Sequence, residues 1–238
     1  MRVTIHQPEF ASWLGFFQKA SLADTFILLD DAQFRKNYFQ NRNRVRTRDG
    51  WTWITVPVER DGLSTKINEV RIALTSNPRW TQKIETTVHH AYGRAPHFES
   101  VFSEFTHYLR KTSHSLVDLN IALIRWMLKG FGVQCKVLLS SSFESNASGS
   151  QRILELCLAA GADTYVSGVS GRDYLDLDAF KRSEITVEFQ EFYHPVYQQL
   201  HPGFVPLISA LEGLFLFGPS SNQLLQLDWP HRLETVFT

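Results

Sequence analysis

Polar side chains suited to acid–base chemistry follow two apolar runs near the start of the chain. His6-Gln7 comes directly after the first run, and Asp30-Asp31 ends the second. A histidine in this position can act as a general acid or base or contact an anion, and it can equally cap a turn. Neighbouring strand residues point to opposite faces, so only one aspartate readily shares a site with His6. The candidate catalytic residues are His6 and Asp30, and Gln7 and Gln33 are candidate substrate contacts.

A basic segment follows at residues 35–48, with six basic side chains and no acidic one. Alternation over residues 43–58 and the turn signal Asp49-Gly50 predict a β-hairpin. On a strand, the arginines at 42, 44, 46 and 48 would share one face, which suits a nucleotide sugar, ATP or RNA. A charge-protected edge strand is the alternative. Asn41 and Arg42 are the candidate contacts, and Tyr38 and Phe39 could stack on a base or sugar or belong to the core.

A glycine-containing turn, residues 167–174, follows a later predicted strand. Its glycines allow close backbone approach, its serines add donors, and its arginine adds an anion clamp. The turn is neither a Walker loop nor a complete G-x-G-x-x-G, so an ordinary β–α turn is the alternative. The candidate phosphate contacts are Ser167, Gly168, Gly171 and Arg172, and Tyr174, His194 and Tyr197 are expected to line the pocket. The spacing of the histidines supports no metal site.

The elements that must position these residues indicate an α/β fold. Residues 2–30 read as a β-α-β unit, and strands near 133–139, 164–167 and 185–189 alternate with helices near 151–160 and 177–182. Unbroken apolar strands are typical of a parallel sheet covered on both faces, and such sheets bind ligands at the carboxyl ends of their strands. We predict one α/β domain over residues 1–238, with a β-hairpin insertion at about 40–75 and a helical insertion at about 79–130. His6, Gln33 and Arg172 are expected in one pocket.

Composition excludes several classes of protein. The 24 basic and 24 acidic side chains cancel, which excludes a globally basic nucleic-acid coat. Apolar residues make up 43% of the 238-residue chain, enough for a substantial core. The longest apolar stretch, Leu207–Phe217, contains Glu212 and is too short to span a bilayer. Two cysteines without a C-x-x-C motif predict reduced thiols in a cytoplasmic protein.

Several motifs together resemble the WbqC-like family along essentially the whole chain. They are His6-Gln7-Pro8-Glu9-Phe10, Leu29-Asp30-Asp31-Ala32-Gln33-Phe34, Phe39-Gln40-Asn41-Arg42-Asn43-Arg44, Trp53-Ile54-Thr55-Val56-Pro57-Val58, Tyr165-Val166-Ser167-Gly168, Gly171-Arg172-Asp173-Tyr174-Leu175 and His194-Pro195-Val196-Tyr197. Two segments depart from the family pattern, Ala11-Ser12 and Ser209–Glu212. The resemblance implies a role in bacterial surface-polysaccharide (O-antigen) biosynthesis, with transfer of glycine as a suggested activity.

A weaker resemblance concerns architecture. A strand ending in histidine, a helix and a strand followed by Gln33-Phe34 resemble the nucleotidylyltransferase fold, a Rossmann variant with a HIGH motif. The corresponding segment here has only one of the two histidines of that motif, His6. The analogy suggests ATP, with magnesium as the nucleotide's carrier, as a cofactor.

These observations lead to a transferase hypothesis. The expected enzyme forms an amide by moving an acyl group, such as glycyl, to an amino group on a nucleotide-linked sugar. The donor would be an ATP-activated amino acid or an aminoacyl-tRNA, and both are anionic. The alternatives are a non-catalytic protein that binds a nucleotide sugar or an assembly partner in the same pathway, and a structural partner of a glycosyltransferase.

Overall fold

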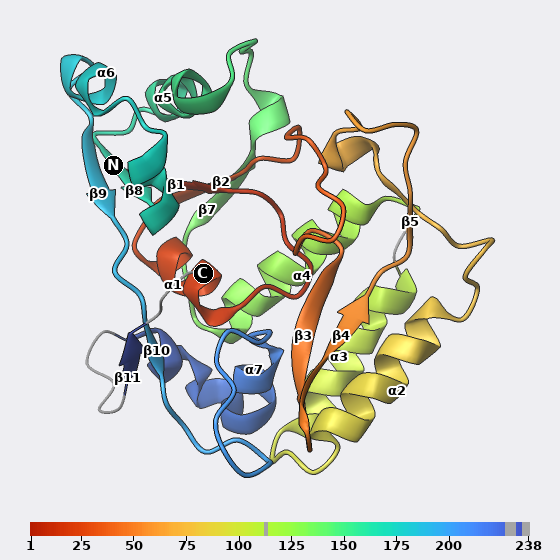
Figure 1. The fold of residues 1–238 in the computed structure, drawn as a ribbon. Coiled ribbons are helices and arrows are strands. Elements are labelled where there is room, and N and C mark those ends of the chain that lie inside the picture. The colour runs from red at the N-terminus through yellow and green to blue at the C-terminus, as the bar shows by residue number, and fades with distance from the viewer. Residues whose placement is uncertain (112–113, 227–231, 235–238) are drawn as a thin grey trace.

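The computed structural model describes residues 1–111, 114–226 and 232–234, and an all-parallel five-stranded sheet forms one side of the molecule (Figure 1). The strands lie in the order β7-β2-β1-β8-β9. Their bounds are β1 Arg2–His6, β2 Thr25–Leu28, β7 Lys136–Leu139, β8 Thr164–Ser167 and β9 Thr186–Phe189. The predicted open parallel sheet with flanking helices is confirmed.

Side chains of the central strands alternate between two hydrophobic clusters. Val3 and Ile5 of β1 pack in the cluster that contains residues of α5 (Gly149–Ala159) and α6 (Leu177–Arg182). Phe26 and Leu28 of β2 pack in the other cluster, with α1 (Leu14–Ser21). Because both faces are covered, the strands can be apolar without a break, as the sequence indicated.

The strand order creates a topological switch point between β1 and β8. The chain builds outward from β1 through β2 to β7, then returns to β8 on the opposite side of β1. Thr4 pairs with Val166 in this parallel register, so His6 and Gly168 follow at the same carboxyl edge. Open α/β sheets bind ligands in the crevice at this place.

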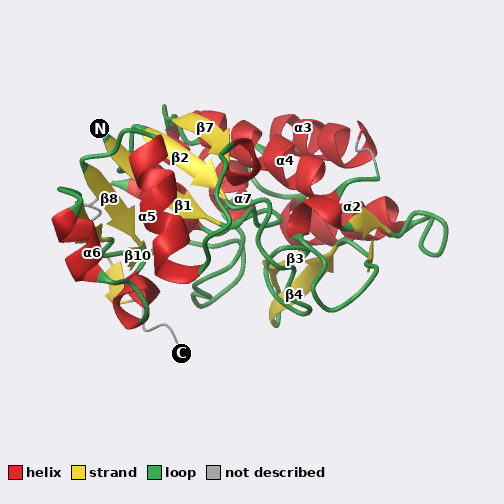
Figure 2. Ribbon diagram, turned by 90° about the horizontal axis from the view of Figure 1, so that it is seen from above, coloured by secondary structure: helices red, strands yellow, loops and turns green. Residues whose placement is uncertain are grey.

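A long insertion between β2 and β7 forms the other side of the molecule (Figure 2). The expected hairpin is β3 with β4, and Asn43 pairs with Ile54 across it. The helical stretch contains three helices. The bounds are β3 Arg42–Thr47, β4 Gly50–Thr55, β5 Val58–Glu59, β6 Arg71–Ile72, α2 Trp80–Tyr92, α3 Phe98–Lys111 and α4 Leu116–Gly130.

One strand starts later than the sequence suggested, at Lys136 instead of residue 133. The amides of Gly132 and Val133 still donate to the carbonyls of Lys129 and Leu128, so they close the end of α4. Gly132 supports this turn with a φ of +66°, a value that favours glycine.

Short elements follow the last strand of the sheet. They are β10 Tyr193–Pro195, α7 Leu211–Phe217, the 3-10 helix Gly218–Leu225 and β11 Arg232–Glu234. Within the part of the chain that the structure describes, no helix has both the length and the apolar composition needed to cross a membrane.

Candidate functional site

His6 ends the central strand with a defined tautomer. Its Nδ1 lies 3.0 Å from the carbonyl oxygen of Gln7. A carbonyl only accepts, so Nδ1 carries the proton and Nε2 keeps its lone pair. Burial and then the neighbouring Lys19 ammonium lower the pKa of His6 to about 3. The ring is therefore neutral near pH 7, and it suits orienting a donor group better than removing a proton.

Lys19 brings a buried amine from α1 to the same edge. Its side chain is only 4% exposed, and Nζ donates to the Ile5 carbonyl at 3.0 Å. A Cβ built on Gly168 would lie 4.0 Å from this Nζ, so the amine lies beside the turn that follows β8. Lys19 thus connects the ends of the two strands that flank the switch point.

Glu9 adds a buried carboxyl from the loop between β1 and α1. The residue is 3% exposed, and its buried Oε2 has no hydrogen-bond partner among the described residues. An unpaired buried polar group costs about 1–3 kcal/mol, more when it is charged. A buried polar group of this kind calls for an explanation, and a ligand that bonds to it is one.

Burial and mutual attraction bring the pKa values of Glu9 and Lys19 close to neutral pH. Burial raises the pKa of Glu9 to about 8, and the Lys19 ammonium opposes that rise. Burial lowers the pKa of Lys19 to about 7, and the Glu9 carboxylate opposes that fall. Both groups can therefore gain or lose a proton near neutrality, which suits general acid–base catalysis.

Side-chain amides fix the loop that carries Glu9. Asn43 Nδ2 donates to the carbonyls of Phe10 and Ala11 at 3.2 and 2.9 Å. Asn120 Nδ2 donates to the Pro8 carbonyl at 3.2 Å, and Gln40 Nε2 donates to Gln7 Oε1 at 2.7 Å. Gln7, predicted to contact substrate, thus also anchors its own loop.

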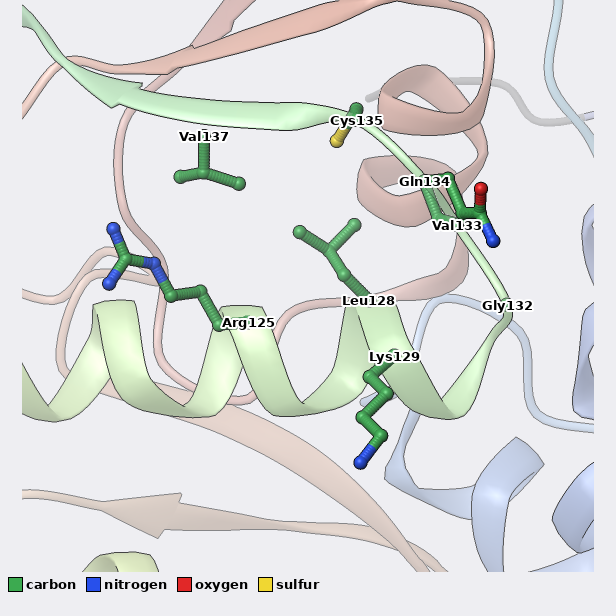
Figure 3. A pocket seen from close by; sticks show the side chains of 8 residues that line it. All are labelled: Arg125, Leu128, Lys129, Gly132, Val133, Gln134, Cys135 and Val137. Atoms are coloured by element: carbon green, nitrogen blue, oxygen red, sulfur yellow. The ribbon is translucent and has the colours of Figure 1, made fainter.

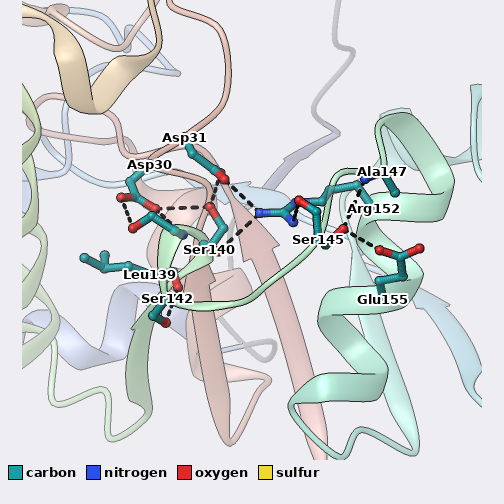
Figure 4. Close-up of polar contacts among 10 residues, drawn as sticks. Asp30, Asp31, Leu139, Ser140, Ser142, Ser145, Ala147, Arg152 and Glu155 are labelled. Carbon is teal, nitrogen blue, oxygen red and sulfur yellow. Dashed lines mark hydrogen bonds and ion pairs between the residues drawn. The ribbon is translucent and has the colours of Figure 1, made fainter.

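Asp30 lies in a different polar cluster, after β2 and β7 (Figure 4). Its carboxylate accepts from Ser140 Oγ at 3.1 Å, from the Ser141 amide at 2.9 Å and from Ser141 Oγ at 2.6 Å. Asp31 pairs with Arg152 at 2.8 Å and also accepts from Ser140. Both aspartates hold the loop after β7, and the catalytic role predicted for Asp30 stays a prediction.

The turn after β8 is compact. The Ser167 hydroxyl, which is buried, donates to the Gly168 carbonyl at 3.0 Å. A Cβ on Gly171 would fall 2.1 Å from Ser167 Oγ, so this position requires glycine. Strand alternation places the Ser167 side chain with Tyr165, on the opposite face from His6. Arg172 lies with its guanidinium 4.6 Å from the Phe189 ring centroid.

The remaining predicted contacts occupy separate places. Asn41 is buried and donates to the Val56 carbonyl at 2.9 Å, and Arg42 stacks over Trp53 at 4.1 Å. Gln33 is exposed and donates to the Leu63 carbonyl at 2.8 Å. No contact within the described part of the chain joins Gln33 or Arg172 to His6, so their shared pocket stays a prediction.

His194 and Tyr197 lie in a buried aromatic group near α7. Each ring centroid is 5.4 Å from that of Phe204. Burial lowers the pKa of His194 to about 4, and the Tyr197 hydroxyl donates to Glu212 Oε2 at 2.9 Å. Tyr174 is exposed. His194 and Tyr197 already contact partners within the protein. The pocket-lining role of all three residues stays a prediction.

A separate hollow of about 480 Å³ lies between α4 and β7 (Figure 3). Leu128 and Val137 face each other across it, and residues 133–135 precede β7. It therefore lies at the amino end of β7, and His6 is not among the residues that line it. Among the described residues, no group of three or more His, Cys, Asp or Glu side chains is arranged to hold a metal ion.

Sequence reasoning missed Glu9 and Lys19. Glu9 stood within the quoted motif His6–Phe10, and Lys19 stood inside a helix whose other side chains are mostly apolar. Seven of the eight residues of α1 are buried, Lys19 among them. A charged residue at the interior of such a short apolar helix was the available signal.

The fold and this site define a doubly wound α/β protein with a buried acid–base cluster at its switch point. The WbqC-like protein family model matches residues 7–224, so the chain belongs to this family. It is also 31% identical over 227 residues to Rv1507c, an uncharacterized protein of Mycobacterium tuberculosis (strain ATCC 25618 / H37Rv). That match covers 94% of this chain and 97% of the relative.

The two segments that depart from the family pattern contact each other. Ser209 Oγ donates to the Ala11 carbonyl at 2.6 Å, and the Ala210 amide donates to the Ser12 carbonyl at 2.9 Å. Ala11 has a φ of +45°, an unusual value for a residue other than glycine. The two departures therefore lie side by side in the fold, joined by two hydrogen bonds to backbone carbonyls.

Proposed function

We propose that the protein is a transferase that forms an amide bond, moving an acyl group such as glycyl to an amino sugar of surface-polysaccharide (O-antigen) biosynthesis. The observation that carries this proposal is the unpaired buried carboxyl of Glu9 beside the buried amine of Lys19 at the switch point. The family resemblance supports the pathway, and a nucleotide-linked amino sugar is the proposed acceptor.

The chemistry needs a base of moderate strength. The acceptor amine attacks the acyl carbon of the donor, and the new C–N bond replaces the bond to the leaving group. The attacking nitrogen loses one proton, which neutral Lys19 accepts, and the leaving oxygen takes up a proton that Glu9 can supply. A lysine with a pKa of about 7 and a glutamate with a pKa of about 8 suit these two tasks.

His6 is assigned an orienting role. Its lone pair at Nε2 can accept a hydrogen bond from the acceptor amine, while Nδ1 is held by the Gln7 carbonyl. Gly168, where the turn after β8 begins, lies beside the Lys19 amine, which supports a place for donor phosphate at this turn. If ATP activates the acyl group, magnesium enters with the nucleotide.

The rival proposal is a binding or assembly protein of the same pathway without catalysis. Such a protein could use the buried carboxyl and amine to hold its ligand, but it has no need for groups that titrate near neutrality. The satisfied Asp30 cluster shows that this sheet edge can hold acidic residues without leaving them unpaired.

The test measures acyl transfer with both donors. Purified protein is incubated with an amino-sugar nucleotide and either glycine with ATP or glycyl-tRNA, and the amide product is detected by mass spectrometry. Pyrophosphate exchange into ATP reports activation. We expect product with one donor and none with Lys19→Met. Binding of the acceptor without product from either donor would favour the rival proposal.

A further inference from the structure

Aromatic rings and arginines lie together along the β3–β4 hairpin and the loop that precedes it. Ring centroids run from Tyr38 to Phe39 at 5.5 Å, from Phe39 to Trp53 at 6.0 Å and from Trp53 to Trp51 at 5.3 Å. Tyr38 and Trp51, at the two ends, are 42% and 43% exposed. We call these four rings the aromatic platform.

Arginines stack onto the platform instead of pairing with acids. Arg42 lies 4.1 Å from the Trp53 centroid, and Arg44 lies 5.2 Å from the Trp51 centroid. The buried Nε atoms of both have no hydrogen-bond partner within the described structure. Nη2 of Arg42 donates to the Asn37 carbonyl, and Nη2 of Arg44 donates to the Leu207 carbonyl at 2.9 Å. Among the described contacts, the Nη1 groups are left to bond to phosphate oxygens.

Charge around the platform is strongly positive. Residues 35–58 contain six basic side chains and a single acidic one, Asp49, in a chain that is neutral overall. Aromatic stacking surfaces within a positive field are the combination by which proteins hold single-stranded nucleic acid. A neutral glycan would need no such field.

The platform begins at the candidate site. The Phe10 amide, next to Glu9, donates to the Phe39 carbonyl at 3.0 Å. Burial and then the Glu9 carboxylate raise the pKa of Tyr38, which places that ring near the acid. A strand of nucleotides on the platform would therefore end near Glu9 and Lys19.

We propose that the aromatic platform binds single-stranded RNA, so that the acyl donor of this transferase is the aminoacylated end of an RNA. The donor assignment rests on the proposed function, whereas the binding of RNA by the platform does not. Exposed bases stack on Tyr38 and Trp51, and Arg42 and Arg44 bond to the phosphates between them.

The experiment measures binding of a labelled single-stranded RNA of about 12 nucleotides by fluorescence anisotropy, a length within the range of such sites. Trp51→Ala and Tyr38→Ala should each weaken binding by at least about five-fold, and Trp51→Phe should restore most of it. Tyr193→Ala is the matched control, because Tyr193 is 42% exposed on β10, away from the platform. Thermal melting confirms that each variant is folded.

Competition separates the platform from general attraction between charges. Binding should fall as salt rises, by a log–log slope of about −0.7 for each phosphate contacted. Duplex RNA, whose bases are already stacked, should compete poorly. Absence of binding, equal competition by duplex RNA, or wild-type affinity in Trp51→Ala would overturn the proposal. A polyanionic polysaccharide that displaces the RNA and depends on Trp51 would assign the platform to a glycan instead.

The two proposals fail separately. Lys19→Met should lose transfer and keep RNA affinity, since Lys19 lies off the platform. Platform-dependent RNA binding without transfer from any donor would contradict the proposed function and leave the RNA site standing. Transfer from glycine and ATP without RNA binding would do the reverse.

Discussion

Two polar clusters follow neighbouring strands at the carboxyl edge of the sheet. After β2 and β7, the carboxylates of Asp30 and Asp31 bond to serines and to Arg152 (Figure 4). After β1, Glu9 keeps an unpartnered buried oxygen, and Lys19 donates only to a backbone carbonyl among its described contacts. At the same edge of the sheet, the carboxylates of Asp30 and Asp31 are hydrogen-bonded, whereas one oxygen of Glu9 is not.

This difference distinguishes side chains that hold a loop in place from side chains that remain able to act on a ligand. A fully bonded carboxylate has nothing left for a ligand unless the loop it holds comes apart. An unpaired buried acid beside a buried amine is costly until a ligand completes the set. Position at a sheet edge therefore narrows the search, and hydrogen-bond pairing distinguishes Glu9 from Asp30 and Asp31 at that edge.

The largest expected effect comes from Lys19→Met. Acyl transfer should fall by about 10²–10⁴-fold, the usual contribution of a general base. Unfolded lysine keeps its proton to a pKa of about 10.4, while in the folded state the pKa is about 7. Folding therefore releases a proton between these values, stability rises with pH there, and the variant should lose that rise.

Turnover assays and urea unfolding at pH 6 and pH 9 measure both effects. Lys181→Met, at an exposed lysine of α6, is the control and should leave both unchanged. Full activity in Lys19→Met would contradict the acid–base role proposed for Glu9 and Lys19.

Asp30→Ala tests the other cluster. Removing a carboxylate that accepts three hydrogen bonds should lower the free energy of unfolding by about 2–4 kcal/mol. Turnover per folded molecule should remain near wild type. Denaturant titration and active-site-normalised kinetics provide the readouts, with exposed Asp178→Ala on α6 as control. Lost turnover with unchanged stability would instead support the catalytic role predicted for Asp30.

Glu9→Gln tests the coupling within the functional cluster. The carboxylate raises the pKa of Lys19, so its removal should lower that pKa further. The acidic limb of the pH–rate profile should then move to lower pH by about 1 unit. A profile over pH 5–9 measures the shift. A limb that stays in place, or moves to higher pH, would mean that Lys19 is not the titrating base.

The smallest expected change in stability comes from Arg172→Ala. Its contact with Phe189 contributes about 0.5–1 kcal/mol at an exposed site. If Arg172 holds donor phosphate, the variant should weaken donor binding by about 1.5–3 kcal/mol, the usual contribution of a charge-assisted hydrogen bond. Calorimetric titration with ATP or charged tRNA measures the affinity for the donor. Unchanged affinity in the variant would contradict a phosphate-binding role for Arg172.

Local patterns were sufficient for much of the fold. Continuous apolar runs predicted the parallel strands, and Asp49-Gly50 predicted the turn between β3 and β4. The helix at Leu177–Arg182 was placed at its observed bounds. These features depend on neighbouring residues in the sequence, so a single sequence contains the necessary information.

The sequence did not reveal which polar side chains have hydrogen-bond partners in the fold. Lys19 is buried because α1 packs near Gly168, about 150 positions further along the chain. Arg46 seemed part of a ligand-facing row, yet its guanidinium donates to Gln199 and to the Pro202 carbonyl. Arg48 falls in the hairpin turn, beyond the end of β3. Distant partners decide which polar residues remain free, and periodicity does not reveal them.

The position of β8 beside β1 also sets an order of events during synthesis. The first strand leaves the ribosome early, but its second neighbour is complete only after residue 167. At about 5–20 residues per second, the delay is roughly 8–30 s. Throughout that interval one edge of β1 lacks its backbone partners. The crevice at the switch point can form only when this late strand arrives, so a nascent chain released before then has no place to bind its substrates.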